Sequence, residues 1–124
     1  KPTKSGDFDA LANVKFESDS IVTVAYAKRG DSLFYGHGGA MMTKAPDAAA
    51  RLLSITNDPF VEGFMTADHV EKYKGSLQAI DCTFEGWNAV LFANSLTNKA
   101  YQLHEYRYLA AAIYSRILEG DFAL

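Results

Sequence analysis

The residues best suited to chemistry form a glycine-rich run, Gly36-His37-Gly38-Gly39. Glycine lets backbone amides approach an anion closely, and His37 could bind a ligand or transfer a proton near neutral pH. Arg51 and Arg107 could complete such a site, because guanidinium forms paired, charge-assisted hydrogen bonds with phosphate or carboxylate. The run does not open directly into a helix, as phosphate-binding loops do, and its spacing matches no nucleotide-binding motif. A flexible exit from a hairpin is the alternative interpretation.

Metal binding and nucleophilic catalysis have weaker support. The histidines His37, His69 and His104 include no pair four residues apart, so no helix would present two of them to a metal ion. A cysteine nucleophile needs an exposed thiolate beside a base, whereas the single cysteine, Cys82, lies on the same face of an expected strand as Ile80 and Phe84. We therefore expect a buried, inert thiol, and the sequence indicates no catalytic residue, metal or cofactor.

A different signal comes from residues 99–118, which are apolar or aromatic on almost every side of a helix. A helix that is apolar all round must be covered all round, and 124 residues supply little material for that. The segment therefore indicates a partner chain, although a domain core with tyrosines at its rim is the alternative. Tyrosine combines an apolar ring with a polar tip and is enriched at interfaces. The candidate interface residues are Tyr101, Tyr106, Tyr108 and Tyr114.

Composition narrows the possible functions. The net charge of −3, without a continuous basic stripe, disfavours nucleic-acid binding. No stretch approaches the roughly 18 consecutive apolar residues of a membrane-spanning helix. One cysteine allows no intrachain disulfide and fits a reducing compartment, so the cytoplasm is favoured. The chain begins at Lys1 and not at methionine, which is compatible with a processed N-terminus.

The elements that would position these residues follow from local patterns. We expect a flexible arm at residues 1–7 and a single α+β domain at residues 8–124. The expected elements of the first half, given by residue numbers, are a short helix at 8–12, strands at 21–27 and 32–35 joined by a turn at 28–31, and a helix at 46–55. Those of the second half are a helix at 67–73, strands at 76–84 and 87–94, and the long helix at 99–119.

This order reads as two successive strand–strand–helix units. It predicts a four-stranded antiparallel sheet built from two β-hairpins, in ββα-ββα order, with helices packed on one face. The other face would be exposed unless a second chain or a ligand covered it. The expected core residues are Val22, Val24, Leu52, Leu53, Ile80, Leu91, Leu109, Ile113 and Ile117.

The sequence favours a soluble, non-catalytic binding or accessory module that self-associates or binds another protein. The alternative is a protein that binds, or a small enzyme that acts on, an anionic small molecule through residues 36–39 with Arg51 and Arg107.

Overall fold

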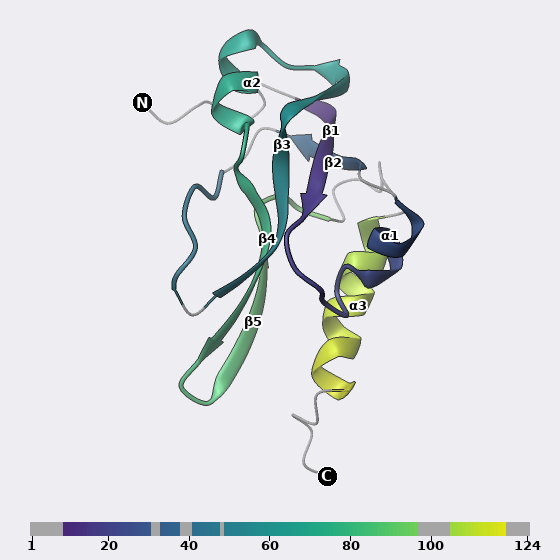
Figure 1. Ribbon diagram of the computed structural model, residues 1–124, viewed down its shortest axis with the longest axis vertical. Helices are drawn as coiled ribbons and strands as arrows, with labels where there is room; N and C mark the ends of the chain where they lie inside the picture. The colour runs from purple at the N-terminus through teal and green to yellow at the C-terminus, as the bar shows by residue number, and fades with distance from the viewer. Residues whose placement is uncertain (1–8, 31–32, 38–40, 48, 97–104, 119–124) are drawn as a thin grey trace.

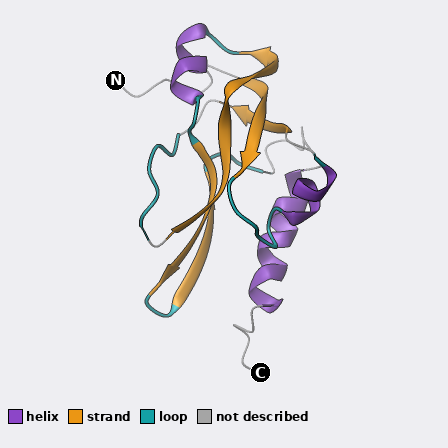
Figure 2. Cartoon of the chain, in the orientation of Figure 1, coloured by secondary structure: helices purple, strands orange, loops and turns teal. Residues whose placement is uncertain are grey.

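The computed structural model describes residues 9–30, 33–37, 41–47, 49–96 and 105–118 (Figure 1). Its main element is a curled, five-stranded antiparallel sheet in the order β2-β1-β3-β4-β5. Figure 2 shows that the helices lie at one end of this sheet and along one side of it. The strands are β1 (Asp9–Phe16), β2 (Leu33–His37), β3 (Ala49–Phe64), β4 (Leu77–Phe84) and β5 (Trp87–Phe92). The helices are α1 (Val24–Arg29), α2 (Ala67–Tyr73) and α3 (Tyr106–Leu118).

The predicted four-stranded sheet in ββα-ββα order is therefore wrong. The structure contains a fifth strand, β1, where a short helix was expected at residues 8–12. Side chains of β1 alternate along the strand, with Ala10, Ala12 and Val14 buried. This period of two is the signature of a strand with one covered face.

The helix predicted at residues 46–55 is also wrong, because most of this segment belongs to β3. Alanine and leucine favour helices locally, but β3 pairs with β1 on one side and β4 on the other. Four consecutive residues of β3, from Leu52 to Ile55, are buried. Burial on both faces of a central strand outweighs the local helix propensity.

The opposite error occurs at residues 21–27, where a β-branched run predicted a strand. Helix α1 occupies Val24–Arg29 and ends at Gly30, which has a φ of 70° and donates its N–H to the last turn. The ring of Tyr26 in α1 packs 4.7 Å from the ring of Tyr108 in α3. Strand propensity reflects packing context, and here this aromatic contact is made from a helix.

The second half follows the sequence prediction closely. Strands β4 and β5 form a hairpin through the turn at Glu85 and Gly86. The Thr66 side chain accepts a hydrogen bond from the His69 N–H, which caps the start of α2 as expected. Helix α3 also forms, although residues 97–104 lie outside the described part of the chain.

The sheet curls because its long strand is irregular. The β1–β3 register shifts near Ala12, and the β3–β4 register shifts near Leu53. Such bulges bend a strand and increase its twist. Pro59, which has no N–H for a ladder, lies in the shifted part of β3 between Ile55 and Phe60. Gly63 has a φ of 110°, and a Cβ there would lie 2.4 Å from the Asp9 carbonyl oxygen, so β1 approaches too closely for any larger residue.

The curled sheet and α3 enclose the main core. Tyr108 of α3 has no exposed surface and lies 6.0 Å from Phe34 on β2 and 6.5 Å from Phe92 on β5, measured between ring centroids. These strands form the two edges of the sheet, so one ring contacts both. Helix α3 therefore packs in the open side of a half-barrel.

Burial confirms only part of the predicted core. Val22, Leu52, Leu53 and Ile80 are buried, as expected. The prediction is wrong for the remaining five residues, which are between 38 and 58% exposed: Val24, Leu91, Leu109, Ile113 and Ile117. Three of these lie on α3. No helix in the described part of the chain is long and apolar enough to cross a membrane.

Candidate functional site

The residues proposed for anion binding lie in different surroundings. Gly36 and His37 belong to β2, where they pair with Ala10 and Asp9 of β1, and Gly38 and Gly39 lie outside the described residues. Arg51 is exposed on β3, near Glu17, whose pKa is lowered mainly by the hydrogen bond from Ser54 and to a smaller extent by the charges of Lys15 and Arg51. Arg107 is exposed on α3, with its guanidinium carbon 5.7 Å above the Tyr26 ring centroid. The two arginines thus lie in different surroundings.

The tyrosines proposed for an interface also differ from one another. Tyr108 is a core residue, Tyr106 is half-buried and Tyr114 is 61% exposed. Tyr101 lies outside the described residues. Of the four, Tyr114 has the surface exposure that an interface residue needs in an isolated chain.

The inward face of α3 carries an unusual number of polar groups. Glu105, immediately before the helix, is 1% exposed, and Ser115 is equally buried. Ser115 donates its hydroxyl proton to the Ala112 carbonyl oxygen at 2.7 Å. Arg116 forms a 2.6 Å ion pair with Asp81 on β4, and each side chain is about 20% exposed. The Arg116–Asp81 pair joins α3 to the sheet, whereas the Ser115 hydrogen bond lies within the helix.

Glu105 is the buried acid that the sequence analysis did not identify. Its Oε1 atom accepts a hydrogen bond from the Tyr35 backbone N–H of β2 at 2.5 Å. Burial raises the pKa of the Glu105 carboxyl to about 8, because the charged form is poorly solvated. Burial, followed by the nearby Glu105, also raises the pKa of Tyr73 on α2. Glu105 is therefore mainly neutral at pH 7 and joins α3 to an edge strand.

Most exposed side chains of α3 are apolar or aromatic, and Arg107 is a charged exception. Leu109 is 40% exposed, Ile113 58% and Ile117 50%, and Ala110 is also exposed. We call the residues Tyr106, Ala110, Ile113 and Ile117 the outer stripe. Their spacing of four, three and four matches the core positions of a coiled coil. The buried residues Tyr108 and Ser115 lie on the opposite side of the helix, so the outer stripe faces away from the chain's own core.

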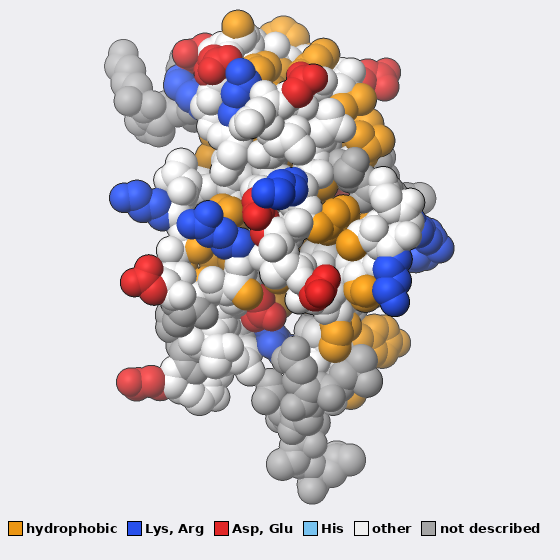
Figure 3. All heavy atoms as spheres, viewed as in Figure 1, with side chains coloured by type: hydrophobic (Ala, Val, Ile, Leu, Met, Phe, Trp, Pro, Cys, Tyr) orange, Lys and Arg blue, Asp and Glu red, His pale blue; other side chains and the backbone are white. Residues whose placement is uncertain are grey.

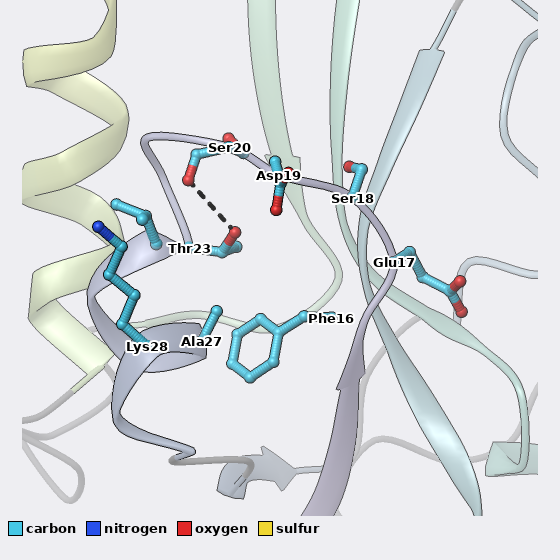
Figure 4. A pocket seen from close by; sticks show the side chains of 9 residues that line it. Phe16, Glu17, Ser18, Asp19, Ser20, Thr23, Ala27 and Lys28 are labelled. Atoms are coloured by element: carbon cyan, nitrogen blue, oxygen red, sulfur yellow. Dashed lines mark hydrogen bonds between the residues drawn. The ribbon is translucent and has the colours of Figure 1, made fainter.

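A surface cavity of about 480 Å³ lies between the end of β1 and α1 (Figure 4). Phe16, Val24 and Ala27 supply apolar lining, while Asp19, Thr23 and Lys28 supply polar groups. Figure 4 shows the Asp19 side chain pointing into the cavity above the Phe16 ring, whereas Glu17 points away from it. The sequence did not predict this cavity, because its pattern placed residues 21–27 in a strand.

Cys82 is buried, as expected, and burial raises the pKa of its thiol, with a further contribution from Asp81. No group of three or more histidine, cysteine, aspartate or glutamate residues within the described ranges could hold a metal ion. On the face drawn in Figure 3, acidic and basic side chains are interspersed, without a broad patch of one sign.

Comparison of the chain with protein-family models, with curated proteins and with solved structures finds no match. Any function is therefore inferred from the geometry of α3 and of the cavity.

Proposed function

We propose that this protein is a non-catalytic interaction module that self-associates through the outer stripe of α3. The observation that carries the proposal is the distribution of polarity on this helix. Its covered face includes Glu105 and Ser115, whereas its exposed face includes Leu109, Ile113 and Ile117. Water normally favours a polar exposed face, because complete burial of an apolar side chain contributes about 1.5–3 kcal/mol, and these three side chains are still 40 to 58% exposed. A second protein surface on the outer stripe would remove this conflict.

A second copy of the chain suits the outer stripe for two reasons. The stripe contains no charged residue, so two copies would not repel one another along it. An antiparallel pair of α3 helices also places Ile113 of one copy opposite Ala110 of the other, and Ile117 opposite Tyr106. The Ile113–Ala110 contact then pairs a large residue with a small one, which fills space better than the Ala110–Ala110 contact of a parallel pair. Such a twofold arrangement is the commonest form of homo-oligomer.

Sedimentation velocity at micromolar protein tests this proposal. The wild-type chain should contain a species larger than the 13.6 kDa monomer. Ile113→Glu should shift the population to monomer, because it would bury a charge in the centre of the interface. Leu91→Glu is the matched control, since Leu91 is 47% exposed on β5, away from α3, and should leave the larger species intact. A wild-type chain that sediments only as monomer would contradict self-association.

The anionic-ligand alternative has less support from the described residues. Arg51 lies on β3 and Arg107 lies over the Tyr26 ring, and the cavity beside α1 includes the acidic residue Asp19. A thermal-shift screen with phosphorylated metabolites still provides its test, because stabilisation that is lost in Arg107→Ala would support this alternative.

A further inference from the structure

We propose that the cavity between β1 and α1 binds the charged group of a small organic cation, in particular an alkylammonium group. This inference is independent of the outer stripe. It rests on the shape of the cavity, on the direction of the Asp19 side chain and on the balance of hydrogen-bond donors and acceptors around it.

The cavity has a negative group with few competing contacts. Asp19 is exposed, and among the described residues no hydrogen bond or ion pair reaches its carboxylate. Figure 4 shows this carboxylate directed into the cavity on the same side as the Thr23 hydroxyl. Glu17 is engaged elsewhere, because its carboxylate accepts a hydrogen bond from the Ser54 hydroxyl at 2.5 Å and contacts Lys15. The pKa of Glu17 is lowered accordingly.

Two of the neighbouring hydroxyl groups donate their protons within the protein, whereas the Ser20 hydroxyl accepts a hydrogen bond from the Val22 N–H at 3.1 Å. Ser18 donates to the Arg51 carbonyl oxygen at 2.6 Å, and Thr23 donates to the Ser20 carbonyl oxygen at 3.5 Å. Their oxygen lone pairs remain able to accept hydrogen bonds. A ligand group with several N–H donors therefore suits the cavity better than a carboxylate or phosphate group.

The apolar lining determines the rest of the ligand. In Figure 4 the Phe16 ring lies below Asp19. Val24 and Ala27 of α1 also line the cavity. An aromatic ring attracts a cation through its electron-rich face, and the aliphatic residues can cover a short alkyl chain. Lys28 lies along the same wall, so its positive charge opposes binding of a cation and limits the affinity.

Amide chemical-shift mapping by NMR with butylammonium chloride tests this inference. Butylammonium should shift the amides of residues 16–28, while butyrate and butanol at equal concentration should not reproduce these shifts. Asp19→Asn should weaken binding about tenfold or more, through loss of a charge-assisted contact. Lys28→Gln should strengthen it by about two- to threefold, because a nearby like charge is removed. Asp47→Asn is the matched control, since this exposed carboxylate does not line the cavity, and it should have no effect.

A second probe, N-acetyl-lysine methylamide, distinguishes a free amine from a lysine side chain of another protein. Shifts from both probes would identify a site open enough for a peptide, and shifts from butylammonium alone would identify a site for a free amine. Equal binding of butanol and butylammonium, unchanged affinity in Asp19→Asn, or no shifts in residues 16–28 would overturn the inference.

Discussion

The two faces of α3 differ less in polarity than those of an ordinary surface helix. The face against the sheet includes the ring of Tyr108, and also Ser115, the Arg116–Asp81 ion pair and Glu105 just before the helix. The face toward solvent includes Leu109, Ile113 and Ile117. The inward face therefore joins the helix to the sheet by specific contacts, whereas the outward face leaves apolar side chains in solvent. Apolar content alone does not show which face of a helix belongs to the core of its own chain.

Replacing one tyrosine on each face of α3 by alanine should give the largest difference between the faces in the free energy of unfolding. Tyr108→Ala should lower the free energy of unfolding by about 3–5 kcal/mol, because it empties a site that contacts α1, β2 and β5. Tyr114→Ala, on the same helix but 61% exposed, should change it by less than about 0.5 kcal/mol. Urea unfolding of dilute protein measures both values. Similar costs for the two variants would remove the distinction between the faces.

The buried acid should give the inward face a dependence on pH. The folded chain holds the Glu105 proton up to about pH 8, whereas an unfolded glutamic acid releases it near its ordinary value of 4.5. The folded state thus binds more protons between these values, and its stability should fall as the pH rises from about 5 to 8. The slope should approach about 1.4 kcal/mol per pH unit.

Glu105→Gln isolates this contribution, because glutamine can still accept the Tyr35 hydrogen bond and cannot ionise. Urea unfolding across pH 5 to 8 should show a weaker decline in this variant than in the wild-type chain. Parallel curves for the two proteins would show that Glu105 is solvated in the folded state.

A smaller effect is expected from the ion pair that joins α3 to β4. Arg116→Gln should lower the free energy of unfolding by about 1 kcal/mol, because the pair with Asp81 is largely shielded from solvent. Lys72→Gln is the control, since its pair with Asp68 is exposed and should contribute less than about 0.5 kcal/mol. A larger loss in Lys72→Gln than in Arg116→Gln would contradict the inferred packing of α3 on β4.

Truncating one side chain of the outer stripe in the monomer should give the smallest change in the free energy of unfolding. Ile113→Ala in protein dilute enough to be monomeric should alter the free energy of unfolding by less than about 0.5 kcal/mol. Chemical denaturation monitored by fluorescence at submicromolar protein measures this. A loss above about 2 kcal/mol would place Ile113 in the core of its own chain.

Local sequence patterns predicted the second half of the fold and failed in much of the first. The β4–β5 hairpin and α2 have their turn and capping residues next to them in sequence, at Gly86 and Thr66. Strand β3 depends on pairing with β1 and β4, which are distant in sequence, so the helix propensity of residues 46–55 was misleading. The alternation of Ala10, Ala12 and Val14 was a usable signal for β1, but small alanines made it weak.

The candidate site was predictable only in outline. The apolar character of residues 99–118 pointed to a partner, and the structure shows which part of α3 is exposed. The sequence did not indicate which residues of α3 face inward, because Tyr108 is buried by both edges of a curled sheet that was not predicted. The cavity depends on the path from Phe16 to Lys28, which was assigned to the wrong elements.

The concentration dependence of urea unfolding tests the contrast between the faces most directly. If the outer stripe holds two folded copies together, the wild-type midpoint should rise with protein concentration, because dissociation accompanies unfolding. Ile113→Glu should have a midpoint that does not depend on concentration and that equals the wild-type value in the dilute limit. A wild-type midpoint that stays constant over a hundredfold range of micromolar concentrations would contradict self-association through α3.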